Sequence, residues 1–192
     1  MNEALYRKLQ EDVRVYVNGP ARALSERIEE TGECGAEVRE ELKERGFLKL
    51  AAPEEYGGTG LNFLQYLELL ELFSQLHGSI RMIVHVSNGI WRPIHYKASK
   101  EQKRRFVKPL VQGELTAAFA LTEPTTGAGT DIRTSARKEN GEFVLNGAKW
   151  MVAFGDTADY VLLFARMENT SGQEGTIALM VPSGSPGLSI KK

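Results

Sequence analysis

The chain has 192 residues, enough for one large domain or two small ones, and its hydrophobic share of 42% allows a buried core. Its 24 basic and 25 acidic residues are interspersed and nearly cancel, which argues against a nucleic-acid surface or a polybasic membrane anchor. No apolar stretch approaches the roughly 18 residues that a membrane helix needs, so we expect a soluble, cytoplasmic protein.

The N-terminal part of the chain predicts three helices. Its charged start, MNEALYRKLQED, lacks the apolar region of a signal peptide. Apolar residues then recur at helical spacing, and breaks in this period place the helix ends at Gly19-Pro20, Gly32 and Gly46. Between the second and third helices lies Cys34, the single cysteine, so no intrachain disulfide can form.

Three further helices follow a loop at 52–61. Each begins at a residue that can cap a helix N-terminus, namely Asn62, Ser79 and Ser99. Ser99 also forms a capping box with Gln102. The last of these helices runs to about Val111, although Pro109 strains its final turn because proline lacks the N–H that the helix needs.

After Gly113 the hydrophobic period changes from helical to strand-like. Asn140-Gly141 and Asn146-Gly147 are hairpin signals. Short runs rich in β-branched and aromatic residues occupy 116–122, 132–138, 142–146, 148–154, 159–166 and 176–182, and the chain ends in a further run, LSIKK. We therefore predict an α+β fold, with an N-terminal all-α helical domain over 1–115 and an antiparallel β-barrel or sandwich domain over 116–192 that ends in mid-strand.

The segment LTEPTTGAGTD (121–131) joins two of the predicted strands. Pro124 ends strand pairing because it has no N–H, so Thr122 lies at a sheet margin with its hydroxyl and N–H free to meet a ligand. Gly127 and Gly129 allow the backbone to approach a ligand closely. This margin suits a flat polar ring or a pyrophosphate. The alternative is a glycine-rich loop that only connects two strands.

Other kinds of site have weaker support. No lysine follows the glycines as in a P-loop, and Ile132 stands where a Rossmann fingerprint needs its third glycine. There is no Gly-x-Ser-x-Gly elbow of a serine hydrolase. The adjacent Glu54 and Glu55 point apart in an extended loop, so they are no evident acid/base pair. We expect no metal site, because metal-ligand spacing is absent among His77, His85 and His95.

Three separated segments resemble the acyl-CoA dehydrogenase family of flavoproteins. PEEYGGTGL (53–61) is similar to the family's Pro-Glu-x-Tyr-Gly-Gly-x-Gly-Leu loop. EQKRRFVKPLVQGELTAAFALTEP (101–124) is similar to its helix leading into the first β strand. NGAKWMVAFGDTADYVLLFAR (146–166) is similar to its second flavin-contacting stretch. The order and spacing of these segments agree with the family over essentially the whole chain.

The resemblance implies an N-terminal helical domain, a central β domain and a C-terminal four-helix bundle. It also implies that FAD binds against the β domain beside an acyl-CoA thioester, in fatty acid metabolism. In the family, a glutamate removes the α-proton of the thioester while the β-hydride goes to flavin N5. The electrons then leave to an electron-transferring flavoprotein.

The resemblance also carries over single residues. Those that fall where the family contacts the flavin are Phe119, Leu121 and Thr122. Thr130 falls where a serine of the family contacts both the flavin region and the CoA thioester chain. Met151 and Ala153 align with a tryptophan and a threonine of the second flavin-contacting stretch, and Trp150 is displaced from that tryptophan by one position. Ala153 cannot donate the hydroxyl hydrogen bond that the threonine offers near flavin N5.

No segment of the sequence matches the family's C-terminal bundle, which supplies the catalytic base and most of the oligomer interface. We expect the 192-residue chain to be inactive alone and to form a homo-oligomer, or a heteromer with a partner that carries such a bundle. No glutamate takes the base role here, because Glu123 at the strand end is interpreted as structural. Two functions remain: part of an FAD-dependent acyl-CoA dehydrogenase, or a non-catalytic module that binds acyl-CoA, flavin or a partner subunit.

Overall fold

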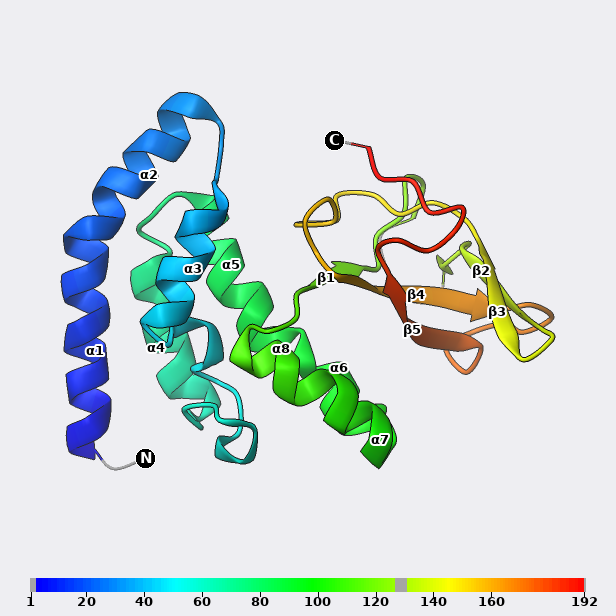
Figure 1. Ribbon diagram of the computed structural model, residues 1–192, viewed down its shortest axis with the longest axis horizontal. Helices are drawn as coiled ribbons and strands as arrows, with labels where there is room; N and C mark the ends of the chain where they lie inside the picture. The colour runs from blue at the N-terminus through cyan, green and yellow to red at the C-terminus, as the bar shows by residue number, and fades with distance from the viewer. Residues whose placement is uncertain (1–2, 127–130, 192) are drawn as a thin grey trace. The chain divides into compact units, whose positions relative to one another are not determined.

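The computed structural model describes residues 3–126 and 131–191, which fall into two compact units, Met1–Glu114 and Leu115–Lys192 (Figure 1). The first unit is helical and the second is built on a sheet. The helical unit comprises α1 (Glu3–Asn18), α2 (Pro20–Thr31), α3 (Ala36–Glu44), the 3₁₀ turns η1 (Phe47–Lys49) and η2 (Glu54–Tyr56), α4 (Phe63–Phe73), α5 (Gly78–Gly89), α6 (Trp91–Lys97), α7 (Lys100–Gln102), the π-helical η3 (Lys103–Val107) and α8 (Lys108–Gln112).

The ends of the first helices lie where the sequence predicts them. Helix α1 stops before Gly19, and Pro20 opens α2 at a position where a missing N–H costs nothing. Gly32 and Gly46 adopt the left-handed conformation, with φ of 71° and 77°. A side chain is strained in this conformation, so glycine is the residue that ends these helices at least cost.

The predicted N-terminal caps are confirmed at two of three positions. Asn62 and Ser99 each form a capping box with the residue three positions on. The predicted cap at Ser79 is wrong, because α5 begins at Gly78 and the His77 ring Nδ1 accepts the hydrogen bond from the N–H of Ser79 at 3.2 Å. Within 3–126 and 131–191, no helix is long and apolar enough to cross a membrane.

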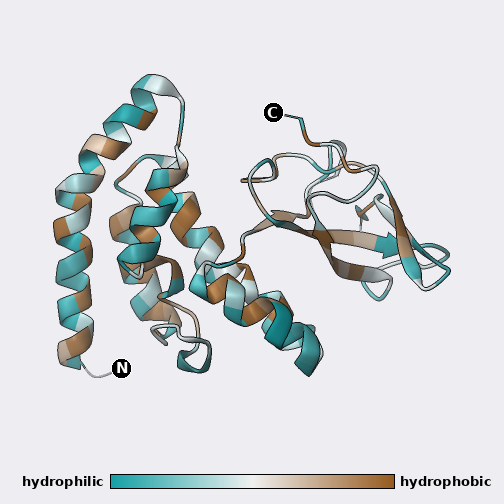
Figure 2. Cartoon of the chain, in the orientation of Figure 1, coloured by the Kyte–Doolittle hydropathy of each residue, from teal (hydrophilic) through white to brown (hydrophobic). Residues whose placement is uncertain are grey.

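Helix α5 is the centre of the helical unit and contacts α3, α4, α6, α8 and η1. Many residues of α4 and α5 are hydrophobic, whereas hydrophilic residues cover much of α1 (Figure 2). One buried polar side chain of α5, Asn88, is 1% exposed. Its Oδ1 accepts from the N–H of Ala51 at 2.9 Å, and its Nδ2 donates to the carbonyl oxygens of Phe47 and Val84, both at 2.9 Å. Asn88 therefore ties α5 to the turn that follows η1.

Asn88→Ala should lower the free energy of unfolding of the helical unit by about 3 kcal/mol. The buried N–H of Ala51 and carbonyl of Phe47 lose their bond to this side chain, and a buried unpaired group costs about 1–3 kcal/mol. Urea denaturation followed by circular dichroism measures the change. The exposed Asn18 at the end of α1 is the matched control, and Asn18→Ala should change the stability by less than about 0.5 kcal/mol. Equal stabilities of the two variants would contradict the role of Asn88.

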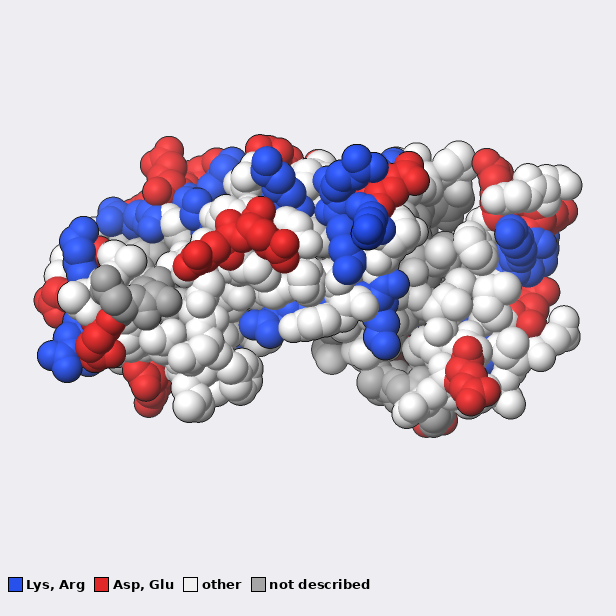
Figure 3. All heavy atoms as spheres, turned by 90° about the horizontal axis from the view of Figure 1, so that it is seen from below, with Lys and Arg blue, Asp and Glu red and all other residues white. Residues whose placement is uncertain are grey.

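The helix that starts after Ser99 widens to a π-helix at η3 and continues through Pro109 to Gln112. Proline cannot donate to the carbonyl of the preceding turn, and its ring crowds that carbonyl, so a wider turn relieves the strain. The exposed side of this segment is basic, with Lys and Arg gathered over α6–α8 (Figure 3). Six basic residues accompany the single acidic Glu101 between 97 and 108, and they are Lys97, Lys100, Lys103, Arg104, Arg105 and Lys108.

The second unit is a sheet in which β4 is central. Its strands are β1 (Ala117–Ala120), β2 (Ser135–Glu139), β3 (Glu142–Asn146), β4 (Tyr160–Met167) and β5 (Thr176–Pro182). Strand β5 pairs antiparallel along β4, from Tyr160↔Pro182 to Arg166↔Thr176. Strands β1 and β2 both pair parallel with β4, and β3 pairs antiparallel with β2. Since β5 occupies one edge of β4, β1 and β2 follow one another along the other edge.

The predicted antiparallel β-barrel or sandwich is therefore wrong. Among the described residues the sheet is mixed and open, with the order β1-β4-β2-β3 and β5 on the far edge of β4. Parallel pairing needs a long crossover between the strands, and the β2–β3 hairpin lies within the crossover from β1 to β4. Alternating hydrophobicity predicts strands but not their direction. The helical unit and the overall α+β class are confirmed.

The two predicted hairpin turns have different outcomes. Asn140 and Gly141 both have positive φ, 51° and 86°, and join β2 to β3 as a two-residue turn. The turn predicted at Asn146-Gly147 is wrong, because no strand follows it directly. A Cβ on Gly147 would lie 2.7 Å from the Cα of Thr134, so the backbone there approaches another segment closely. Position 147 therefore needs glycine because a side chain there would collide with Thr134.

Two predicted strands are also wrong. The segment 148–154 is not a strand, since Met151 and Phe154 have left-handed φ values of 52° and 62°. Positive φ cannot continue a strand. The final run LSIKK is not in a strand over its described residues, 188–191.

Candidate functional site

The chain leaves the sheet after β1 and returns to the same edge of β4 at β2. The connecting segment, 121–134, contains the Thr-Glu-Pro motif. Three of its predicted site residues, Gly127, Gly129 and Thr130, lie outside the described residues. At the far end of the segment, Arg166 Nε of β4 donates to the carbonyl oxygen of Ile132 at 3.1 Å. Both ends of the segment are thus tied to the sheet.

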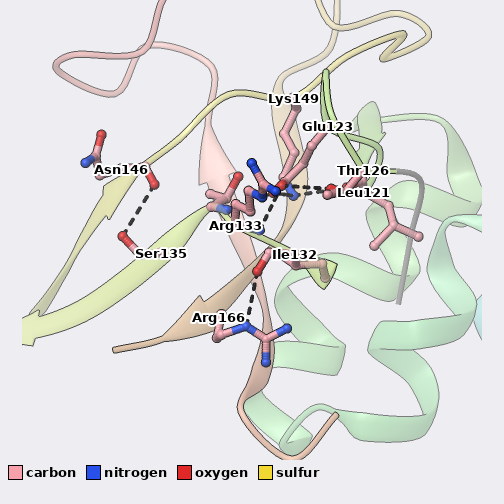
Figure 4. Close-up of polar contacts among 10 residues, drawn as sticks. Leu121, Glu123, Thr126, Ile132, Arg133, Ser135, Asn146, Lys149 and Arg166 are labelled. Atoms are coloured by element: carbon pink, nitrogen blue, oxygen red, sulfur yellow. Dashed lines mark hydrogen bonds and ion pairs between the residues drawn. The ribbon is translucent and has the colours of Figure 1, made fainter. Parts of the chain in front are cut away.

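Glu123 is the centre of the hydrogen bonds that hold this segment (Figure 4). Its two carboxylate oxygens accept from the backbone N–H groups of Arg133 and Thr134, both at 2.8 Å. The Thr126 hydroxyl donates to Oε2 at 3.1 Å, and Lys149 Nζ donates to Oε1 at 2.9 Å. Glu123 therefore joins both ends of the segment to the stretch that carries Lys149.

The Glu123–Lys149 ion pair is buried, with side chains 4% and 7% exposed. Burial alone raises the pKa of Glu123, but the hydrogen bonds from its neighbours outweigh burial and hold the pKa at about 2. These neighbours are Thr134, Lys149 and Arg133. A carboxylate of such low pKa stays ionised at neutral pH and is a weak base. The structure thus supports a structural role for Glu123.

Two predicted site residues, Leu121 and Thr122, lie beside Lys149 and Trp150. Lys149 Nζ donates to the Leu121 carbonyl oxygen at 3.0 Å, and the Trp150 N–H donates to the Thr122 carbonyl oxygen at 2.9 Å. Both carbonyls are therefore occupied. The N–H and hydroxyl of Thr122 donate to no group among the described residues. Within the described residues, Thr122 therefore keeps two unused donors at the end of β1.

Phe119 of β1 forms an aromatic surface with Phe164 of β4. Their ring centroids are 5.0 Å apart, and Phe119 is 40% exposed although it lies within a strand. Phe119 pairs with Leu162, so its side chain shares a sheet face with those of Leu162 and Phe164. Leu121, two residues after Phe119 in the chain, is half-buried. An aromatic surface thus lies on β1, three residues before Thr122 in the chain.

Met151 and Ala153 follow the stretch that is bonded to Thr122. Met151 is 81% exposed and has left-handed φ, and Ala153 is half-buried. Trp150 is also exposed, at 57%.

Lys149 and Phe164 were not predicted as site residues. Lys149 is the single charged residue in the otherwise apolar run AKWMVAF, and a lysine buried there needs a carboxylate partner. That signal could have paired it with Glu123. No sequence signal links Phe164 to Phe119, since strand pairing brings them together. Within the part of the chain that the structure describes, no group of three His, Cys, Asp or Glu side chains could hold a metal ion.

Comparisons with known proteins agree with this architecture. The N-terminal domain of the acyl-CoA dehydrogenases matches residues 4–114, and the middle domain of the same family matches residues 118–192. An acyl-CoA dehydrogenase of Bacillus subtilis is 32% identical over 99% of this chain and 50% of its own length. The chain belongs to the acyl-CoA dehydrogenase family.

Solved structures show the same fold. A glutaryl-CoA dehydrogenase from Mycobacterium smegmatis in complex with FADH2 superposes with a TM-score of 0.87 at 25% identity, over 98% of this chain and 48% of that one. A chain in a structure of the electron transferring flavoprotein of Acidaminococcus fermentans superposes with a TM-score of 0.88 at 26% identity, over 100% and 51% of the two chains. This chain therefore spans about half the length of the relatives that it matches.

Proposed function

We propose that this chain provides the FAD-contacting region of a flavoenzyme that dehydrogenates an acyl-CoA thioester between its α and β carbons. The observation that carries the proposal is the end of β1, where the exposed ring of Phe119 is followed three residues later by Thr122, whose N–H and hydroxyl donate to no described group. An aromatic surface next to polar donors fits a flat ring system with a polar edge. The family membership and the FADH2 bound to the relative from M. smegmatis support FAD as that ring system.

In this proposal, the residues that contact FAD are Phe119, Leu121, Thr122, Thr130, Met151 and Ala153. Bound FAD supplies the acceptor for the hydride that leaves the substrate. Phe119 and Leu121 cover the ring and exclude water, while the N–H and hydroxyl of Thr122 donate to its polar edge. Thr130 also contacts the acyl-CoA thioester. Glu123 and Lys149 hold Leu121 and Thr122 in place without touching the reacting atoms.

The proposal extends to the partners and setting of the chain. Acyl-CoA is the substrate, and an electron-transferring flavoprotein accepts the electrons. Its support is the likeness to a chain in the A. fermentans flavoprotein structure. The chain acts in fatty acid metabolism in the cytoplasm, within a homo-oligomer or with a partner that carries a helical bundle. Its functional division is a helical domain over 1–115 and a β domain over 116–192.

Flavin retention tests this proposal. The purified 192-residue chain should be yellow or should bind added FAD saturably, and acid precipitation should release FAD into the supernatant. A colourless, monodisperse chain that binds no FAD would overturn the proposal and favour the non-catalytic module.

Thr122→Val should weaken FAD binding by about 1 kcal/mol, or about fivefold in Kd, because it removes one donor hydroxyl from the proposed contact. Fluorescence titration with FAD measures the change. Thr125→Val is the matched control, since Thr125 is exposed three residues away and should leave the Kd unchanged. Equal FAD affinities of both variants and the unaltered chain would show that Thr122 is the wrong residue.

A further inference from the structure

The surface over α6–α8 concentrates positive charge on one stretch of the helical unit (Figure 3). Residues 97–108 include six basic residues and one acidic residue, whereas the rest of the unit, 1–96 and 109–114, has 11 basic and 16 acidic residues. We call the six basic residues the basic surface, and they are Lys97, Lys100, Lys103, Arg104, Arg105 and Lys108. The helical unit is therefore positive here and negative over the remainder of its sequence.

None of these six side chains forms an ion pair with a residue that the structure describes. Other cations of the same unit do have such partners, since Arg45 on α3 pairs with Glu41 four residues before it at 3.0 Å. The single acidic residue of the stretch, Glu101, has the same spacing to Arg105, yet no ion pair joins them. The charge of the basic surface is thus not neutralised within the described chain.

This concentration of charge opposes the helix that carries it. Lys100, Arg104 and Lys108 follow one another at four-residue spacing, and like charges at that spacing repel each other on a helix. Lys100 also lies directly after the N-cap residue Ser99, at the end of the helix where the backbone dipole is positive. Anionic groups bound from outside would offset both repulsions.

The helix presents the basic surface on a fixed support. Its inner side packs into the core, with Phe106 and Leu110 only 7% and 4% exposed and Val107 fully buried. Five of the six basic side chains are exposed, and Lys103 is half-buried. Because the backbone under these side chains is already ordered by packing, a partner that binds here does not have to order it.

Two kinds of polyanion fit this surface poorly. A helix that lies on a membrane inserts its apolar face into the lipid, but the apolar face of this helix is packed against its own unit. Single-stranded nucleic acid stacks on aromatic rings among the cations, whereas the one aromatic residue within 97–108, Phe106, is buried. The negative remainder of the unit also opposes a large anionic surface.

A short acidic peptide segment fits better, because it can contact the basic surface alone. From Lys100 to Lys108 the helix rises about 12 Å, at about 1.5 Å per residue. About four residues of extended chain cover that distance, at about 3.3 Å per residue. Carboxylates accept hydrogen bonds from ammonium and guanidinium groups without needing a ring or a lipid phase.

We propose that the basic surface is a docking site for a short segment of another protein that is rich in Asp and Glu. The site goes beyond the proposed dehydrogenation and depends on neither FAD nor acyl-CoA. Carboxylates of the segment pair with the basic side chains and offset their mutual repulsion. Since these pairs are exposed to water, binding is reversible and sensitive to salt.

Fluorescence polarisation with a labelled hexaglutamate peptide and the full chain tests the proposal. Binding should be saturable at low ionic strength and should weaken at least about tenfold in concentrated salt, which screens exposed charges. Hexaglutamine has the same length without the charge and should not bind. A triple variant with Lys100→Gln, Arg104→Gln and Lys108→Gln should bind hexaglutamate at least about tenfold more weakly.

A second triple variant is the matched control, with Lys8→Gln, Arg14→Gln and Arg22→Gln. These three residues are exposed cations of α1 and α2 in the same unit, so the net charge changes equally. This variant should keep its hexaglutamate affinity within about twofold. Circular dichroism of both variants should match that of the unaltered chain, because the substituted side chains lie outside the core.

Four results would overturn the proposal. One is an equal loss of hexaglutamate binding in the two triple variants, which would reflect net charge alone. Tighter binding of phosphatidylglycerol vesicles than of hexaglutamate would assign the basic surface to lipid, and tighter binding of hexathymidylate would assign it to nucleic acid. Salt-sensitive self-association in sedimentation, abolished by the first triple variant, would assign it to a second copy of this chain.

Discussion

Glu123→Gln should lower the free energy of unfolding of the β unit by about 3–5 kcal/mol. The substitution leaves the Lys149 ammonium buried without a counter-charge, and breaking a buried pair in this way carries a cost of that size. Lys149→Met should lower the free energy of unfolding by about as much, because it leaves the Glu123 carboxylate buried without a counter-charge. The loss of unfolding free energy in the double variant should be about 1–3 kcal/mol smaller than the sum of the two single losses, because no unpaired charge is left.

The same unit offers a matched control for these variants. Arg137 and Glu139 also form an ion pair, at 2.8 Å, but their side chains are 49% and 50% exposed. Glu139→Gln should therefore cost less than about 1 kcal/mol. Guanidinium denaturation followed by tryptophan fluorescence measures all four variants. In a Trp91→Phe background, Trp150 is the only tryptophan and reports on the β unit alone. Equal losses for Glu123→Gln and Glu139→Gln would contradict the buried pair.

The stability conferred by Glu123 should also depend on pH. Its pKa is about 2 in the folded chain, below the ordinary value of 4.5. The folded state therefore releases this proton more readily than the unfolded state, and the contribution is complete above pH 4.5. The contribution should disappear as the pH falls from 4.5 towards 2. Glu123→Gln should lack this part of the pH dependence, so parallel pH profiles of the two chains would be the contrary result.

A polypeptide of these 192 residues should dehydrogenate acyl-CoA at least about 10²–10⁴-fold more slowly than a full-length relative. A positioned general base contributes an effect of that size. Glu123, the carboxylate of the Thr-Glu-Pro segment, is unsuited to this role, because its low pKa and its ion pair with Lys149 oppose proton uptake. The proposed activity is therefore expected to need residues beyond those of the proposed FAD contact.

The turnover assay uses excess FAD, a panel of short, branched and aromatic acyl-CoAs, and an artificial electron acceptor. FAD binding is measured on the same sample, so that missing turnover is not mistaken for missing flavin. A second assay adds a separately expressed helical bundle from a full-length relative. Turnover that appears only with the bundle would support a shared active site. Rapid turnover by the 192 residues alone would refute the expectation.

Much of the local structure was predictable because its causes act over a few residues. Asn62 and Ser99 form the expected capping boxes, since both partners lie within one helical turn. Asn140-Gly141 forms the expected turn because its two residues tolerate positive φ. Within the described residues, the N–H and hydroxyl of Thr122, two positions before Pro124, donate to no group. The same local reasoning was wrong at Ser79, where a histidine ring competed for the cap.

By itself, the sequence determined the change from helices to strands, most helix ends and the position of the Thr-Glu-Pro margin, because periodicity, caps and proline act locally. Only the tertiary structure decided the direction of β1 and β2 and the partner of Glu123. Lys149 lies 26 residues from Glu123, and Phe164 meets Phe119 only through the pairing of β1 with β4. These contacts depend on which edge of β4 each strand occupies. Hydrophobic alternation is the same for either edge and either direction, so it cannot specify them.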